Sequence, residues 1–322
     1  MAPGPSSRES ESRLKRIPTT SCLVVVSASL PQPDGRWSSA APLPAPTQEL
    51  SAAVLHGHIY VAGGIDQTSR PSAAAFRYDP SINRWEQIAN LPAPRHHMPL
   101  AVVGDTLYAV GGLAGGNFVP ESTLWLFRED MNRWEARAPL PAPRGASGAA
   151  AAGGLLIVVG GWGRHRGLVD STAIYDPATN RWREGAPIPT PRDHLAVAAL
   201  NGLVYAIGGR PLNPDHNFAV VEIYDPARDR WTTGAAMPSR RGGLAAAVVG
   251  TAIHVVGGES RNGVFANHEL YDPAADRWTV AAALPLARHG LAAAAIAGKL
   301  YVIGGGPRAG FAQTDAVDVF SP

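Results

Sequence analysis

The sequence contains little cysteine, little lysine and no long apolar run. Cys22 is the only cysteine among 322 residues, so neither an internal disulfide nor a cysteine-based metal cluster can form. No stretch of about 18 or more apolar residues occurs, so nothing in the sequence predicts a membrane span or a membrane partner. Lys15 and Lys299 are the only lysines among 28 basic residues, and the net charge of +2 is too small to predict a nucleic-acid partner.

The first 35 residues differ in composition from the rest of the chain. Residues 1–20 are rich in Ser, Arg and Pro without periodicity, which is typical of a disordered tail. The short apolar stretch 22–30 also fits a weak signal segment. We therefore treat residues 1–35 as a tail and leave the location open. A cytoplasmic location is favoured, and a secreted or periplasmic one follows if residues 1–29 act as a signal.

Two residue patterns recur along the remainder with the same period. Gly-Gly pairs begin at Gly63, Gly111, Gly160, Gly208, Gly257 and Gly304. Tryptophans recur at Trp37, Trp85, Trp134, Trp182, Trp231 and Trp278. Both series have spacings of 48, 49, 48, 49 and 47 residues. Because two residue types keep the same irregular spacing, the chain contains six tandem repeats.

Each repeat contains four strand-like segments, which we name a to d. In the fourth repeat, the small apolar segment LAVAAL leads through the tight turn Asn201-Gly202 into the apolar segment VYAIGG. Segment c ends in Tyr-Asp-Pro, and segment d begins at the tryptophan, which we expect to pack blade against blade. His254 takes the tyrosine position of segment b, so we predict a packed core histidine. A four-stranded repeat of roughly 50 residues is typical of one propeller blade, so we predict an all-β, six-bladed β-propeller over residues 36–322.

The two ends of the repeat region predict how the ring closes. Residues 317–322 match segment c and its turn, so the last repeat lacks segment d. Arg36-Trp37 is a segment d without the three segments that should precede it. Pairing the two ends completes the sixth blade and removes an open sheet edge. Residues 24–30 could compete for the position of segment c, although they lack Tyr-Asp-Pro.

The ordered set Pro-x-x-Arg, Gly-Gly, Tyr-Asp-Pro and Trp resembles the kelch repeat, and the resemblance covers residues 36–322. In kelch propellers that hold peptides or sugars, the d–a loops between blades and the b–c loops after Gly-Gly commonly form the ligand-binding mouth. Within this group, the bacterial N-acetylneuraminate epimerases are similar to this chain in size, repeat type and arginine-rich loops.

The d–a and b–c loops are predicted to carry the function, because loops vary between blades while the scaffold repeats. These loops contain 12 arginines and 7 acidic residues, an excess of +5. Such a mouth suits a protein segment or an anionic small molecule such as a sugar acid. The expected ligand-binding residues are Arg95, His97, Arg144, Trp162, Arg164, Arg192, His194, Arg210, Arg241, Arg288 and Arg308. The alternative is that the lead-in arginines, which belong to the repeat pattern, brace the loops.

Two functions from different classes follow. The first is a non-catalytic module for protein or carbohydrate binding that recognises an anionic or protein ligand at the mouth. The second, implied by the epimerase resemblance, is an isomerase in which arginines hold the carboxylate of a sugar acid and an acid or histidine moves a proton. Glu259, directly after a Gly-Gly pair, is the first candidate base, followed by Glu49, His97 and His194.

Two features distinguish these functions. An enzyme requires an acid and two arginines around one pocket, whereas a protein-binding face spreads its contacts. No paired metal-ligand motif of fixed spacing is present, so we expect no metal and no cofactor. We also expect a monomer.

Overall fold

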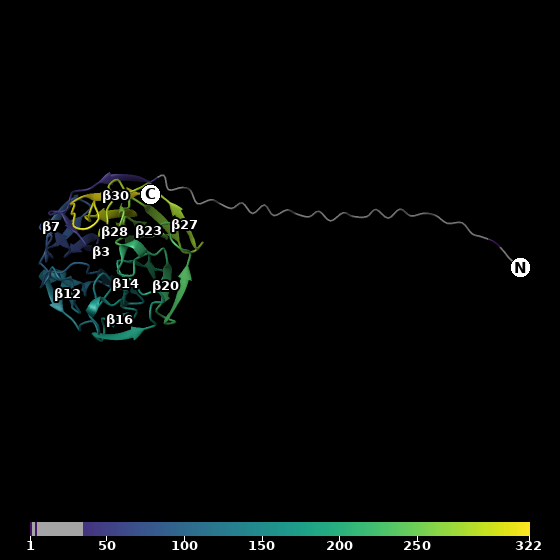
Figure 1. Cartoon of the computed structure of the whole chain (residues 1–322), viewed down its shortest axis with the longest axis horizontal. Helices are drawn as coiled ribbons and strands as arrows, with labels where there is room; N and C mark the ends of the chain where they lie inside the picture. Colours follow the sequence, from purple (N-terminus) through teal and green to yellow (C-terminus); the bar gives the residue numbers. More distant parts are fainter. Residues whose placement is uncertain (2–3, 5–34) are drawn as a thin grey trace. The chain divides into compact units, whose positions relative to one another are not determined.

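The computed structural model describes residues 1, 4 and 35–322. It contains six four-stranded antiparallel sheets, which surround a central axis as the blades of a propeller (Figure 1). The helical pieces within residues 35–322 are three short 3-10 turns, Glu129–Met131, Arg164–Arg166 and Pro214–His216. The prediction of an all-β, six-bladed propeller is therefore confirmed. The signal segment and the competing strand predicted upstream lie outside the described residues.

The first five blades each contain four strands in chain order. Strand a is the innermost strand, and it lies next to strand a of the neighbouring blades around the axis. Blade 1 contains β3 (Ser51–Leu55), β4 (His58–Ala62), β6 (Ala75–Asp79) and β7 (Arg84–Gln87), and blade 2 contains β8 (Leu100–Val103), β9 (Thr106–Val110), β12 (Leu124–Arg128) and β13 (Arg133–Ala136). Blade 3 contains β14 (Gly148–Ala152), β15 (Leu155–Val159), β16 (Thr172–Asp176) and β17 (Arg181–Gly185), and blade 4 contains β18 (Ala196–Leu200), β19 (Leu203–Ile207), β20 (Val221–Asp225) and β21 (Arg230–Gly234). Blade 5 contains β22 (Ala245–Val249), β23 (Ala252–Val256), β26 (His268–Asp272) and β27 (Arg277–Val280).

Blade 6 is built from both ends of the repeat region. It contains β28 (Ala292–Ile296), β29 (Lys299–Ile303) and β30 (Val317–Ser321), with β1 (Arg36–Ser39) as its outer strand. In the antiparallel pairing of β1 with β30, Trp37 lies opposite Phe320. The outer edge of β30 is thereby covered by a strand from the other end of the chain.

Three two-stranded sheets lie in the loops at the mouth. They pair β2 (Thr47–Gln48) with β5 (Ile65–Asp66), β10 (Leu113–Ala114) with β11 (Val119–Pro120), and β24 (Glu259–Ser260) with β25 (Gly263–Val264). The β2–β5 pairing joins the d–a lead-in of blade 1 to its b–c loop. The other two pairings are hairpins within the b–c loops of blades 2 and 5.

The tryptophans join each blade to the one before it. The Trp85 indole N–H donates to the carbonyl oxygen of Ala41 at 2.9 Å, and the other five tryptophans make the same bond at 2.7–2.9 Å. The side chain of Asn83 accepts from the Ala41 N–H at 2.7 Å and from the Tyr78 hydroxyl at 2.6 Å. The predicted blade-to-blade role of the tryptophans is confirmed.

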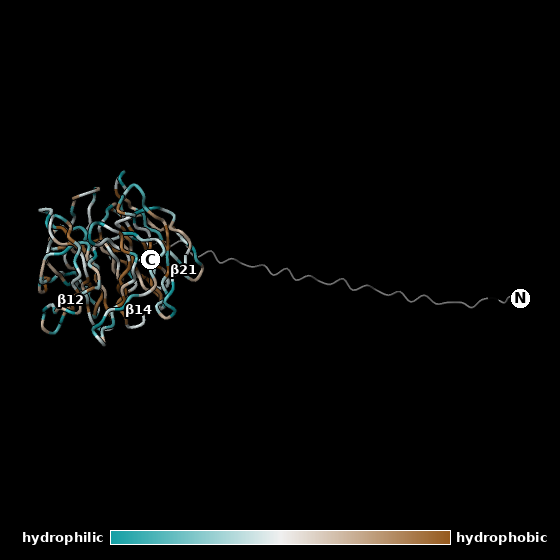
Figure 2. Tube along the Cα trace, turned by 60° about the horizontal axis from the view of Figure 1, so that its bottom comes forward, coloured by the Kyte–Doolittle hydropathy of each residue, from teal (hydrophilic) through white to brown (hydrophobic). Residues whose placement is uncertain are grey.

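The core consists of the apolar faces between neighbouring blades, which form the brown interior strands in Figure 2. Leu55 and Tyr60 of blade 1, for example, pack with Leu107 and Phe127 of blade 2. His254 is buried and hydrogen-bonded to another imidazole, as predicted for a core histidine. None of the helices in the described part of the chain has the length and apolar character that a membrane crossing requires.

Candidate functional site

A closed ring of backbone hydrogen bonds surrounds the axis at the mouth. Its members occupy the same lead-in position in each blade: Glu49, His97, Ala146, His194, Gly243 and Gly290. Each has a positive φ of 51–64°. Each donates its N–H to the carbonyl of the equivalent residue in the preceding blade at 2.6–3.0 Å. The backbone N–H and C=O groups of the ring bond to one another, and the ring fixes the starting points of the four side chains that its non-glycine members carry.

Two further positions per blade complete the wall of the mouth. The residue before each ring member pairs through its backbone with the residue after Gly-Gly. The first set is Gln48, His96, Gly145, Asp193, Gly242 and His289, and the second set is Ile65, Leu113, Trp162, Arg210, Glu259 and Gly306. Three positions repeated in six blades therefore determine the chemistry of the mouth.

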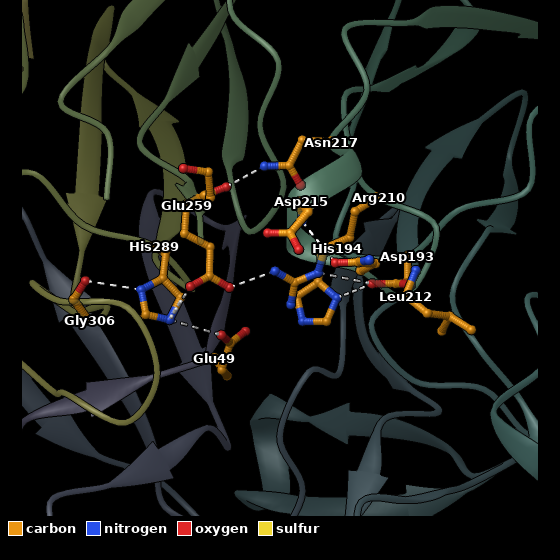
Figure 3. Close-up of polar contacts among 12 residues, drawn as sticks. Glu49, Asp193, His194, Arg210, Leu212, Asp215, Asn217, Glu259, His289 and Gly306 are labelled. Carbon is orange, nitrogen blue, oxygen red and sulfur yellow. Dashed lines mark hydrogen bonds and ion pairs between the residues drawn. The ribbon is translucent and has the colours of Figure 1, made fainter. Parts of the chain in front are cut away.

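Ionisable side chains from these positions form a closed circuit around the axis. The members are Glu49, His97, His194, Asp193, Arg210, Glu259 and His289. Figure 3 labels all of these residues except His97. The Glu259 carboxylate lies 2.7 Å from Arg210 Nη1 and 3.5 Å from His289 Nε2. His289 Nε2 lies 3.7 Å from a carboxylate oxygen of Glu49.

On the other side of the circuit, the imidazoles of His97 and His194 connect Glu49 to Asp193. His97 Nε2 lies 3.2 Å from Glu49 Oε2 and 3.1 Å from His194 Nε2. The Nδ1–H of His194 donates to the Asp193 carboxylate, which also lies 3.4 Å from Arg210 Nε. All seven groups thus contact their neighbours directly within the mouth.

Burial shifts the pKa values of several of these groups. It raises the pKa of Glu49 to about 7, against the opposing charge of His289. It also lowers the pKa of His97 well below the usual 6.5, and the neighbouring His194 lowers it further. Burial alone would raise the pKa of Glu259, but the charges of His289 and Arg210 outweigh it, so the pKa of Glu259 lies below 4.5.

Apolar and aromatic side chains form the opposite wall. Ile65, Leu113, Phe118 and Trp162 come from blades 1 to 3, and Phe311 reaches over from blade 6. The ring centroids of Phe118 and Phe311 are 6.4 Å apart. Together with the charged wall they enclose a cavity of about 180 Å³. The mouth therefore has one hydrogen-bonding side and one aromatic side.

A second cavity of about 160 Å³ follows the axis below the mouth. Small residues of the inner strands, such as Ala149 and Ala246, line it. Glu49, His97 and His194 line both cavities, so they lie where the mouth meets the axial channel.

Comparison with known proteins identifies the family. A family model described as the Attractin/LZTR1 β-propeller matches residues 59–316. The chain belongs to the Attractin/LZTR1 β-propeller family. This confirms the kelch-type assignment that the repeat motifs predicted. The matched residues begin in β4 of blade 1, end just before β30 of blade 6, and include strands of all six blades.

A solved structure has the same fold. The structure of YjhT superposes with a TM-score of 0.76 at 17% identity, covering 88% of this chain and 100% of that one. At this identity the similarity shows the fold alone. No curated protein matches this member of the Attractin/LZTR1 family.

Six of the residues predicted for the site of this family member line the mouth cavity. They are Glu49, His97, Trp162, His194, Arg210 and Glu259. Arg164 and Arg308 lie on exposed b–c loops and do not line it. Arg95 is buried beneath the mouth, where its guanidinium donates to the Pro94 carbonyl at 2.8 Å and lies over the Trp125 ring.

Four predicted arginines point away from the entrance, contrary to expectation. The side chains of Arg144, Arg192, Arg241 and Arg288 are at most 1% exposed. Arg192, Arg241 and Arg288 each donate to a carbonyl of strand b and pair with the buried carboxylates Glu222, Glu269 and Asp318, respectively. Arg144 instead donates to the Ser171 carbonyl at 2.8 Å. The lead-in arginines therefore brace the blades, which was the alternative interpretation.

Asp193 and His289 were not among the residues predicted for the site. Each lies directly before a member of the backbone ring, and they pair through their backbones with Arg210 and Gly306, respectively. When the six repeats are aligned by their Gly-Gly pairs, these two residues occupy the same position of the repeat. That alignment is the feature of the sequence that could have identified them.

Proposed function

We propose that this propeller binds a small hydroxyl-bearing molecule of the sugar type in the mouth cavity. One observation carries the proposal: a single cavity of about 180 Å³ has a charged, hydrogen-bonding wall facing an aromatic wall. Sugar hydroxyls bond to carboxylate, imidazole and guanidinium groups, and their C–H faces pack on aromatic rings. The volume lies below the roughly 300–1,000 Å³ of drug-sized sites, which favours a ligand of monosaccharide size.

The convergence of ionisable groups favours a small molecule over a protein segment. A protein-binding face spreads its contacts, whereas Glu49, Glu259, His289 and Arg210 all face the same small space. The resemblance of the repeats and loops to N-acetylneuraminate epimerases supports a sugar as the ligand class.

The charge of the ligand follows from Arg210, the only arginine that lines this cavity in the described part of the chain. Arg210 already contacts Glu259 at 2.7 Å and Asp193 at 3.4 Å. A carboxylate on the ligand would have to compete with both. We therefore place a neutral sugar first and a sugar acid second, which revises the anionic ligand expected from the loop charges.

A second candidate function is proton transfer on the bound sugar. Glu259 and His289 both face the cavity and lie 3.5 Å apart, which is a suitable arrangement for general acid–base catalysis. Isomerisation at a sugar carbon requires one group to remove a proton and another to supply one. Glu259 would serve as the base.

Binding can be tested by calorimetric titration with neutral sugars, sugar acids and acidic peptides. We expect a sugar to bind, and Glu259→Gln to weaken it by about 10- to 100-fold, because a hydrogen bond to a charged group is worth about 1.5–3 kcal/mol. Phe311→Ala tests the aromatic wall, and its exposed side chain makes loss of folding a minor concern. Arg164→Ala, on an exposed loop outside the cavity, is the matched control. Tight binding of acidic peptides with no binding of sugars would contradict the proposal.

Catalysis can be separated from binding by exchange NMR on the sugar that binds. The wild-type protein should accelerate interconversion of two sugar forms, and Glu259→Gln should reduce that acceleration more than it reduces occupancy at saturation. Binding without any acceleration would eliminate the enzymatic candidate and leave the binding function intact.

A further inference from the structure

Three potential metal-ligand atoms converge at the junction of the mouth and the axial channel. They are Glu49 Oε2, His97 Nε2 and His194 Nε2, which all lie within 4.8 Å of one another. His97 Nε2 is 3.2 Å from the glutamate oxygen and 3.1 Å from the other imidazole nitrogen. Ligand atoms at about 2.0–2.1 Å from a tetrahedral Zn²⁺ are roughly 3.3 Å apart, so these spacings fit one coordination sphere.

The hydrogen positions on His194 follow from its neighbours. Its Nδ1 contacts the Asp193 carboxylate, which can only accept when ionised, so Nδ1 carries the hydrogen. Asp193 is itself held by the Leu212 N–H at 2.7 Å. In neutral His194, Nε2 therefore presents a lone pair to the cluster. This carboxylate–imidazole pairing commonly orients histidine ligands of metal ions.

The form of His97 that can ligate an ion is set by its contact with a second imidazole. His97 Nδ1 lies 2.5 Å from His96 Nδ1, so one of the two nitrogens donates to the other. When His97 is the donor, its Nε2 also presents a lone pair to the cluster.

In this form, two imidazole lone pairs and a carboxylate oxygen of Glu49 converge on one point. A cation at the centre would resolve this arrangement, and two histidines with one carboxylate are a common ligand set for divalent transition metals. We propose that Glu49, His97 and His194 bind one divalent transition-metal ion, with Zn²⁺ as the first candidate. Asp193 and His96 hold the two imidazoles in the ligating form.

The surroundings suit an ion that remains accessible. The three ligand residues line both cavities, so a fourth coordination position can face the mouth. Three protein ligands with one open position are typical of catalytic rather than structural zinc sites. The sequence could not predict this set, because its members come from three blades and are separated by 48 and 97 residues. The proposal stands whether or not the ligand of the mouth is a sugar.

The test is direct titration of the chelator-stripped full chain with Zn²⁺ by calorimetry and with Co²⁺ by visible absorption. We expect one ion per chain and a tetrahedral or five-coordinate Co²⁺ spectrum. His194→Ala and Glu49→Gln should abolish this binding, while circular dichroism confirms that each variant is folded. Asp193→Asn should weaken it by about 10- to 100-fold, as expected for a residue that orients a ligand.

Surface histidines are controlled with the double variant His165→Ala/His216→Ala, because both residues are exposed on b–c loops. This variant should bind the ion as the wild type does. Loss of binding in the double variant, or unchanged binding in folded His194→Ala, would overturn the proposal. Absence of one-to-one binding in the wild type would overturn it as well, and would mean that His97 carries its hydrogen on Nε2. Because no sugar is present, these outcomes are independent of the proposed function.

Discussion

Arg192 provides a decisive test of whether the lead-in arginines brace the blades. Its side chain is fully buried and makes four hydrogen bonds, to Glu222 and to the carbonyls of Thr190, Ala206 and Gly208. Glu222 is also buried and has no other cation within ion-pair distance among the described residues. Arg192→Met would therefore leave a buried, uncompensated carboxylate.

The magnitude follows from the cost of breaking a buried ion pair on one side, which is about 3–5 kcal/mol. Unfolding entropy is about 2.1 cal/mol/K per residue near 60 °C, which gives the propeller about 0.6 kcal/mol/K. Arg192→Met should then lower the melting temperature by roughly 5–8 °C. Scanning calorimetry measures this, with exposed Arg164→Met as a control that should stay within about 0.5 kcal/mol of the wild type.

The double variant Arg192→Met/Glu222→Leu sharpens the test. Replacing both members of a buried ion pair by apolar residues of similar volume is often neutral or stabilising, so it should recover most of the lost stability. The affinity of the mouth for its ligand should remain unchanged in both variants. An unchanged melting temperature together with weaker ligand binding would refute the bracing role and would place Arg192 in the ligand site.

Three further predictions follow from other parts of the propeller. Burial lowers the pKa of His254 to about 4 and that of His268 to about 3, so the unfolded chain takes up protons first and these two histidines alone should lower stability by about 4 kcal/mol between pH 8 and pH 5. His254→Tyr, which restores the residue of most other blades, should remove about half of that loss in urea titrations at the two pH values. Deleting residues 1–41 should expose the outer edge of the last blade and cause aggregation or unfolding, which light scattering and thermal melts would detect; an unchanged melting temperature would refute the closure. Gly290→Ala should displace the Glu49 carboxylate, whose atoms occupy the space of the added Cβ, and should weaken ligand binding at the mouth.

The architecture could be predicted because the repeat places the same requirement on six segments. The Gly-Gly pairs are one example: a Cβ on Gly63 would approach the Arg95 carbonyl to 2.5 Å, and its φ is +70°. The Asp-Pro turns are local and repeated, and the tryptophan indole bonds recur between neighbouring blades with the same spacing of 43–45 residues in five of the six cases. Any one blade could depart from the pattern, as blade 2 does with Phe127, without obscuring the period.

The site was harder to predict because its contacts join different blades. Burial of the lead-in arginines depends on acceptors about 15 and 30 residues away, as with Arg241, the Val255 carbonyl and Glu269. The net charge of the loops could not distinguish these buried, paired arginines from arginines that are exposed on the b–c loops, such as Arg164 and Arg308. The contact of His97 with His194 likewise depends on the assembled ring, because the two imidazoles come from the lead-ins of blades 2 and 4 and meet past blade 3.

The backbone ring explains why the mouth is chemically divided. Because each ring residue gives its N–H to the preceding blade and accepts from the following one, little backbone polarity remains to recognise a ligand. Recognition must come from side chains, most of them at the three variable positions of each blade and the rest, such as Phe118 and Phe311, on the b–c loops. Blade 5 shows the consequence: Gly242 and Gly243 place no side chain at two of its positions, which leaves room for the Glu259 carboxylate to reach Arg210 and His289. Blade 3 combines Gly145 and Ala146 with Trp162 and contributes only an apolar surface. A ring that is rigid in its backbone can thus carry acid–base groups on one side and aromatic groups on the other, since each blade supplies its own side chains independently of its neighbours.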